Sequence, residues 1–147
     1  MKHLQIVSLF IIIASFLSCK KDDPADTIVG NWKTTKLVSS GCTDPEENQN
    51  LTFTDGCYKE SLLQVSICIS ATFSENGTYT LVTKTTFFGA TETDNIDGTY
   101  SISGNKITLC ETPSLCEVSD FTLTENTLIL NSKDVDSSCM SVLTMVK

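Results

Sequence analysis

The stretch Leu62-Leu-Gln-Val-Ser-Ile-Cys-Ile-Ser-Ala-Thr-Phe73 decides the fold class. Every odd-numbered residue from 63 to 73 is apolar, and the residues between them are Gln, Ser, Cys, Ser and Thr. Because successive side chains of a β-strand point to opposite faces, this alternation predicts a strand with one face in a core and the other in water. Cys68 falls on the wet face, so its partner is expected on a covering loop or on the outer face of a neighbouring strand.

The rest of the chain repeats this β pattern. It is rich in Thr, Ser, Val and Ile, and no stretch keeps a helical apolar period for long. Turn signals such as Asn76-Gly77, Asp97-Gly98 and Ser103-Gly104-Asn105 recur along it. We expect strands at 31–39, 62–73, 77–88, 91–102, 105–111, 117–124, 127–133 and 139–146, with a short further piece at 51–54.

This order of strands predicts the fold. Consecutive hairpins with one wet face each favour an all-β architecture, a small antiparallel up-and-down β-barrel of about eight strands. Closure into a barrel also removes the exposed edges of the sheet. A β-sandwich is the alternative. An immunoglobulin-like sandwich is disfavoured, because the only Trp, Trp32, precedes every cysteine of the strand-forming region.

Residues 1–18 have the layout of a secretory signal peptide. Lys2 provides the charged start, an apolar run follows, and small Ser18 precedes the cleavage point. The run is shorter than the roughly 20 residues that a membrane-spanning helix needs. Cleavage after Ser18 leaves residues 19–27 as a charged tether and 28–147 as a single domain, long enough to bury its own core.

Phe16-Leu17-Ser18-Cys19 resembles the lipobox of bacterial lipoproteins. The resemblance implies lipid attached at Cys19, anchoring of the chain to a membrane, and a place in the cell envelope. Lys20-Lys21-Asp22-Asp23 resembles the export signals of Bacteroidota surface lipoproteins, which implies the outer membrane and exposure at the cell surface. Asp26-Thr27-Ile28 matches the O-glycosylation pattern of that group, so Thr27 is a candidate modification site.

The composition argues against several functions. Against 18 Asp and Glu the chain has 10 Lys and Arg, all of them Lys, and the formal net charge is −8. Nucleic-acid binding is not expected, because it needs Lys and Arg to neutralise phosphates. The single His, His3, lies in the signal segment, so His-dependent catalysis is excluded. We expect no enzyme and no cofactor.

Six cysteines follow Cys19: Cys42, Cys57, Cys68, Cys110, Cys116 and Cys139. An even number in an exported chain predicts three disulfides, for which fifteen pairings are open. Zinc is disfavoured because the domain has no Cys-x-x-Cys pair and no His, so no metal site is expected. Cys110 and Cys116 flank a turn-like pentapeptide and favour a local bridge. The remaining pairs that we expect are Cys42 with Cys57 and Cys68 with Cys139.

Ile28-Val29-Gly30-Asn31-Trp32 resembles the Gly-x-Trp signature of lipocalins. Segments 73–79, 98–109 and 123–130 are similar to the lipocalin-like domains of Bacteroidota lipoproteins, so the resemblance covers roughly 28–147. In that family the Trp closes one end of the barrel and the Gly lets the backbone approach it, which implies these roles for Trp32 and Gly30. The chain lacks the Arg that typically packs over the Trp, and Lys147 could replace it only in part.

The resemblance implies a carrier of a small apolar or amphipathic ligand. The inward side chains that would line either a cavity or a solid core are Leu63, Val65, Ile67, Tyr79, Leu81, Tyr100, Ile102 and Phe121. Two hypotheses therefore stay open: a ligand-binding lipoprotein, or a filled barrel whose outer surface or loop 40–60 contacts an envelope protein. The presence of a cavity discriminates between them.

Overall fold

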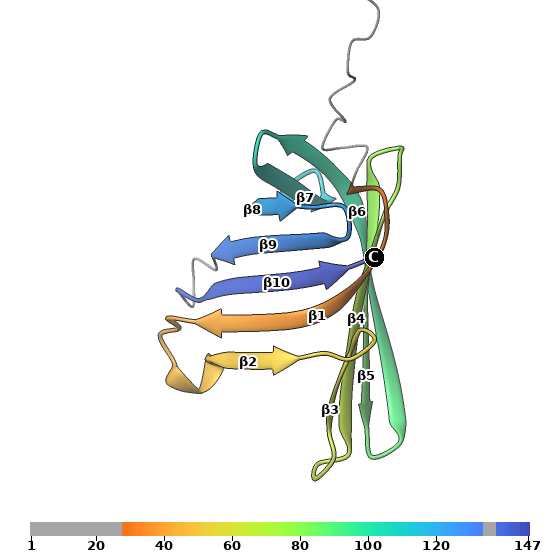
Figure 1. The fold of residues 1–147 in the computed structure, drawn as a ribbon, viewed down its shortest axis with the longest axis vertical. Coiled ribbons are helices and arrows are strands. Elements are labelled where there is room, and N and C mark those ends of the chain that lie inside the picture. The colour runs from red at the N-terminus through yellow and green to blue at the C-terminus, as the bar shows by residue number, and fades with distance from the viewer. Residues whose placement is uncertain (1–27, 134–137) are drawn as a thin grey trace, which may run out of the picture.

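The computed structural model describes residues 28–133 and 138–147, which form one antiparallel sheet closed into a barrel (Figure 1). The strands are β1 (Gly30–Ser40), β2 (Gln49–Thr52), β3 (Cys57–Glu60), β4 (Val65–Phe73), β5 (Thr78–Phe87), β6 (Ala90–Ser103), β7 (Lys106–Thr112), β8 (Leu115–Leu123), β9 (Thr127–Lys133) and β10 (Met140–Val146). A short 3-10 helix, η2 (Pro45–Glu47), precedes β2. The predicted signal segment, Cys19, the tether and Thr27 lie outside the described residues.

Eight strands make the barrel wall. Their order around the barrel is β1-β10-β9-β8-β7-β6-β5-β4, and β4 pairs with β1 to close it. The closing ladder joins Gly30 to Phe73 and Trp32 to Ala71. The fold class predicted from the sequence is therefore confirmed. β2 and β3 extend the sheet beyond the closing ladder, on β1 and β4 respectively.

All eight predicted wall strands are present, and the stretch 62–73 needs one correction. β4 begins at Val65, and residues 61–64 form the turn that follows β3, with a positive φ at Gln64. Leu63, expected to point inward, is instead 60% exposed in that turn. The alternation of side chains runs through the turn unchanged, so the sequence pattern did not reveal the end of the strand. β3 was not predicted.

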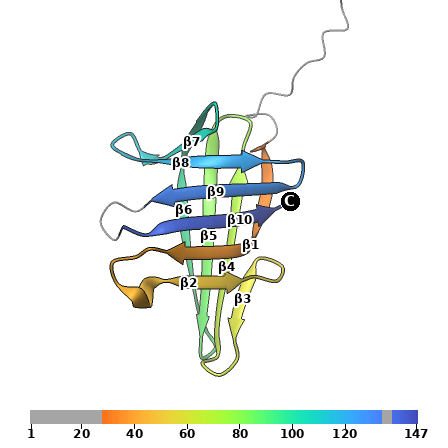
Figure 2. The ribbon, with the colours of Figure 1, turned by 60° about the vertical axis from the view of Figure 1, so that its left-hand side comes forward.

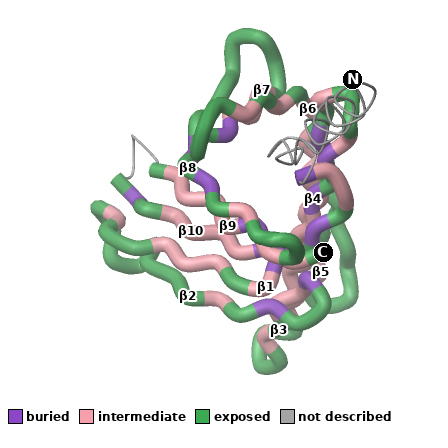
Figure 3. Tube along the Cα trace, turned by 45° about the horizontal axis from the view of Figure 1, so that its top comes forward, coloured by how far each residue is buried: buried purple, intermediate pink, exposed green. Residues whose placement is uncertain are grey.

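The strands bend so that β3–β6 run across the direction of β7–β10 and β1 (Figures 1 and 2). Seen from one end, the strands ring the interior (Figure 3). One end carries the tight β4–β5, β6–β7 and β8–β9 turns together with Gly30 and Val146, and we call it the closed end. The other end carries the β5–β6 and β7–β8 hairpins and the long β1–β4 connection, and we call it the open end.

Trp32 fills the closed end. Its side chain is fully buried, and its Nε1 donates a hydrogen bond to the carbonyl oxygen of Ile28 at 2.7 Å. The ammonium nitrogen of Lys147 lies 4.9 Å from the centroid of the indole ring. Gly30 has a φ of +137°, and a Cβ there would stand 3.2 Å from Cε of Lys147. Lys147 thus covers the Trp at the place where the resemblance to lipocalins expects an Arg.

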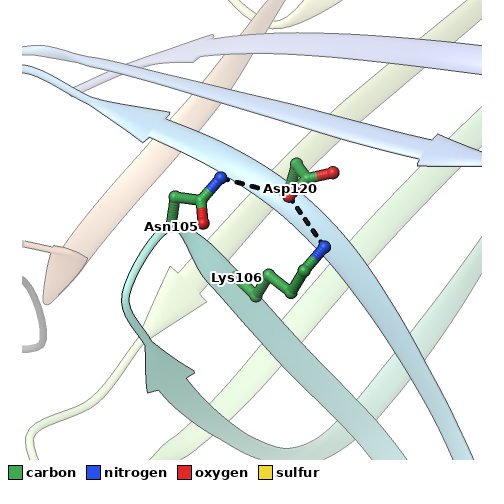
Figure 4. Close-up of polar contacts among 3 residues, drawn as sticks. All are labelled: Asn105, Lys106 and Asp120. Carbon is green, nitrogen blue, oxygen red and sulfur yellow. Dashed lines mark hydrogen bonds and ion pairs between the residues drawn. The ribbon is translucent and has the colours of Figure 1, made fainter.

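Turn contacts also hold this end together. The Oη of Tyr100 donates a hydrogen bond to the carbonyl oxygen of Ser74 at 3.0 Å, across the mouth of the β4–β5 turn. On the outer surface, Asn105 and Lys106 both donate to the carboxylate of Asp120 on β8, at 3.2 and 2.9 Å (Figure 4). Because Lys106 and Asp120 are more than half exposed, this pair adds little to stability.

Three disulfides use all six cysteines of the domain. Cys110–Cys116 is the predicted local bridge, and that prediction is confirmed. The other two predicted pairs are wrong, because Cys57 bonds to Cys68 and Cys42 to Cys139.

Strand pairing explains both corrections. Cys57 lies directly opposite Cys68 in the β3–β4 ladder, and β3 was not predicted from the sequence. Cys42 follows β1 and Cys139 precedes β10, and these strands pair so that Ser40 faces Met140. No helix within residues 28–133 and 138–147 is long and apolar enough to cross a membrane.

A candidate ligand cavity in the barrel

The barrel is not filled by its own side chains. An interior cavity of about 180 Å³ is lined mainly by apolar residues from six of the wall strands. Its lining residues are Ala71, Phe73, Tyr79, Leu81, Leu109, Glu117, Ser119, Leu130, Ser132, Leu143 and Met145. Ala71, Phe73 and Met145 belong to the buried core cluster and form the floor toward the closed end.

A second cavity of about 260 Å³ continues the first toward the open end. Its lining residues are Tyr79, Leu81, Ile96, Leu109, Glu111, Leu115, Cys116 and Glu117. Tyr79, Leu81, Leu109 and Glu117 line both spaces. The two spaces therefore share one wall, made by β5, β7 and β8, and the outer space ends beside the β7–β8 hairpin.

Tyr79 belongs to the buried core cluster and lines both spaces. It is 6% exposed, and its ring lies 6.2 Å from that of Phe73, centroid to centroid. Gly98 faces it across the β5–β6 ladder. A Cβ on Gly98 would stand 2.7 Å from Cε1 of Tyr79 and would also collide with the carbonyl oxygen of Cys110. The ring therefore occupies the space that a side chain at position 98 would need.

The phenol of Tyr79 stays protonated over a wider pH range than usual. Burial is the largest cause that raises its pKa above 10.0, followed by the negative charges of Glu111 and Glu117. At neutral pH the cavity thus presents a phenolic O–H that can donate a hydrogen bond.

The polar groups of the cavity come chiefly from β7 and β8. Glu117 lies opposite Leu109 in the β7–β8 ladder, and Glu111 lies at the outer end of β7. Neither carboxylate forms an ion pair with a lysine of the described residues. Ser119, two residues after Glu117 on the same face, is only 4% exposed. Ser119 lines the inner space, so its hydroxyl faces the cavity, and the buried side-chain oxygen that lacks a partner within the described residues is Thr34 Oγ1 instead.

The residues expected to line a cavity take different places. Tyr79 and Leu81 lie on the wall of both spaces. Three further expected residues pack in or against the buried core cluster instead: Tyr100, Ile102 and Phe121. Val65 and Ile67 are half-buried on β4, and neither lines the two spaces. The expected inward position of Leu63 is wrong, as described above.

Sequence reasoning missed the polar residues of the wall. Glu117 and Ser119 have the same parity as Phe121 on β8, which was expected to point inward. That parity was the available signal, but the search for apolar alternation passed over polar side chains. Glu111 has the parity of Ile107 and Leu109 on β7 and was missed for the same reason.

One group of potential metal ligands occurs among the described residues. It joins Cys42, Glu47 and Cys139. Both sulfur atoms belong to the Cys42–Cys139 disulfide, so they offer no thiolate to a metal ion. The cavity in the barrel is therefore the site with the clearest chemical character.

Comparison with known proteins adds little. No protein-family model matches the chain, and no curated protein matches it. Among solved structures, an odorant-binding protein from bovine nasal mucosa matches with a TM-score of 0.46 and 16% identity, covering 86% of this chain and 74% of that one. A complex of bovine odorant-binding protein with undecanal gives the same values.

Proposed function

We propose that the protein binds a small apolar or amphipathic molecule inside its barrel. The observation that carries this proposal is the cavity lined by Leu81, Leu109, Leu130 and Leu143. A dry apolar cavity of about 150 Å³ is large enough to take benzene, and drug-sized ligands occupy roughly 300–1,000 Å³. Two adjoining spaces of about 180 and 260 Å³ suit a molecule between these sizes.

The place of action that we propose is the outer membrane of a Bacteroidota-type cell, with lipid attached at Cys19 and the barrel at the cell surface. The support is the sequence of the N-terminal segment, together with three disulfides, which form and persist outside the cytoplasm. Growth with an alkyne-labelled fatty acid tests the anchor. The full-length chain should take up the label and its Cys19→Ser variant should not; an unlabelled full-length chain would refute the anchor.

Native mass spectrometry tests ligand binding. The sample is the chain from Lys20 onward, exported behind a cleavable secretion signal and purified oxidised. The expected result is a discrete added mass that leaves on denaturation, or that appears after incubation with a lipid extract. A clean mass under both conditions would count against a carrier.

A second candidate function is contact with another envelope protein, and an exposed apolar patch favours it. Leu62 and Leu63 are 92% and 60% exposed at the tip of the β3–β4 hairpin, and Phe87 and Phe88 are 53% and 62% exposed at the tip of the β5–β6 hairpin. The Phe88 amide donates a hydrogen bond to the Gln64 carbonyl oxygen at 3.2 Å, which joins the two tips. Such a patch is typical of interaction surfaces. Crosslinking from position 62 in cells, against a control at exposed Ser101, tests this candidate.

A further inference from the structure

The mouth of the cavity has one sign of charge. Glu111 and Glu117 are its charged lining residues, and neither cavity is lined by Lys. Both carboxylates line the outer space together with Tyr79, and both raise the pKa of its phenol. Within the described residues, β7 and β8 form one ion pair, Lys106–Asp120, which lies on the outer surface near the closed end. The negative charge at the mouth is therefore not balanced by the surrounding wall.

A second and independent feature is a hydrogen-bonding side chain inside the cavity. Ser119 is 4% exposed and lines the inner space, so it is a polar side chain within the cavity. A ligand that places a donor beside Ser119 would form a hydrogen bond with this hydroxyl, and Glu117 stands two residues away on the same face of β8.

We propose that the ligand is a cationic amphiphile, an alkyl or aryl amine. This inference rests on the proposed ligand-binding function and names the chemical class of the ligand. The apolar part lies between the Leu side chains of the inner space, and the ammonium group lies at the mouth between Glu111 and Glu117. Its N–H groups donate to the two carboxylates, and Ser119 accepts a hydrogen bond from the polar end of the ligand.

Charge and geometry favour an amine over a carboxylate, an alcohol or a metal ion as the ligand. An alkyl carboxylate would bring a third negative charge to the mouth of an acidic protein and would be repelled. A neutral alcohol would leave both carboxylates without a counter-charge. A bare divalent ion is disfavoured, since among the described residues Glu111 and Glu117 belong to no group of three ligand atoms that could hold a metal.

The test compares three compounds that share an octyl chain: octylamine, which is protonated at pH 7, 1-octanol and octanoate. Binding to the oxidised chain from Lys20 onward is measured by isothermal titration calorimetry at low and high salt. We expect octylamine to bind about tenfold more tightly than 1-octanol, and octanoate to bind most weakly. The advantage of the amine should shrink in high salt, which screens the partly exposed charges.

Matched variants locate the charge effect. Glu111→Gln and Glu117→Gln should each weaken octylamine binding about three- to tenfold, a larger change than either makes to 1-octanol binding. Glu125→Gln removes the same charge from the exposed β8–β9 turn at the closed end and should change neither affinity. Far-ultraviolet circular dichroism verifies that each variant is folded.

The outcomes separate the two claims. Equal binding of octylamine and 1-octanol, or an amine preference that survives in Glu111→Gln and Glu117→Gln, would overturn the cationic ligand while leaving ligand binding intact. Tightest binding of octanoate would overturn it as well. Failure of all three compounds to bind, together with a clean native mass, would overturn the proposed function itself.

Discussion

The ring of Tyr79 takes the place of a side chain at Gly98. The two residues face each other in the β5–β6 ladder, and a Cβ at position 98 would stand 2.7 Å from the edge of the ring. Glycine in the interior of a strand often marks such a close approach. The aromatic residue thereby covers a stretch of β6 backbone and, on its other side, forms a wall of the cavity.

Gly98→Ala should destabilise the barrel by about 1–3 kcal/mol, because the added methyl group must displace the Tyr79 ring and the Cys110 carbonyl. Urea denaturation measures the loss. Ser101→Ala, at an exposed position on the same strand, is the control and should change the free energy of unfolding by less than about 0.5 kcal/mol. Equal effects of the two substitutions would contradict the close approach.

Thr34→Val should stabilise the fold by up to about 1–2 kcal/mol. The Oγ1 of Thr34 is buried and has no hydrogen-bond partner in the described structure, so replacing the hydroxyl with a methyl group removes an uncompensated polar atom. Thr35→Val is the matched control, because Thr35 Oγ1 donates to the Thr144 carbonyl oxygen at 3.2 Å. The control should lose stability, and a loss at both positions would mean that Thr34 has a partner.

Lys147→Met should cost about 0.5–1 kcal/mol of stability. The substitution keeps an apolar stem over Trp32 and removes the cation that lies 4.9 Å from the ring. Trp32 is the only Trp, so its fluorescence during urea unfolding reports on this end of the barrel. Lys147→Arg keeps a cation over the ring and should retain the stability of the unchanged protein. An equal free energy of unfolding for the Lys147→Met variant and the unchanged protein would show that only the apolar stem contributes.

The three disulfides should differ in their contribution according to the loop that each closes. The Cys42–Cys139 bridge spans 97 residues and the Cys110–Cys116 bridge spans 6. Loop entropy predicts losses of about 4–5 kcal/mol on replacing the first pair by Ser and about 2–3 kcal/mol for the second. Differential scanning calorimetry of the two double variants gives the order, and the reverse order would contradict the entropic account.

Stability should fall at alkaline pH partly because of Tyr79. Its folded-state pKa is raised above 10.0 by burial and by Glu111 and Glu117. Between pH 10.0, the ordinary tyrosine pKa, and the higher folded-state pKa, the unfolded chain has lost the phenolic proton while the folded chain keeps it. The stability that protonated Tyr79 contributes is therefore complete below pH 10 and is lost as pH rises through the folded-state pKa. Tyr79→Phe should show a shallower decline above pH 10 in urea midpoints, whereas superimposable profiles would refute the shift.

The side-chain alternation in residues 62–73 and its repeats was sufficient to predict the barrel, because period-two burial is a local property of each strand. A turn that keeps the two-residue alternation of apolar and polar side chains cannot be recognised from that alternation. For this reason Leu63 was placed in β4 and β3 was missed. That omission also hid the Cys57–Cys68 pairing. The polar wall of Glu111, Glu117 and Ser119 depends on where β7 and β8 face the cavity, and apolar patterning does not report on it.

The Cys42–Cys139 disulfide has a mechanical consequence. Tension applied between residue 28 and residue 147 would run along β1, cross the two sulfur atoms, and return along β10. Lys33 and Val146 pair at the end where the force enters, so the load would unzip these two strands pair by pair and then stop at the covalent link. β4 through β9 carry no tension on this path. The oxidised molecule therefore has a fixed limit to its extension under load, which the reduced chain lacks.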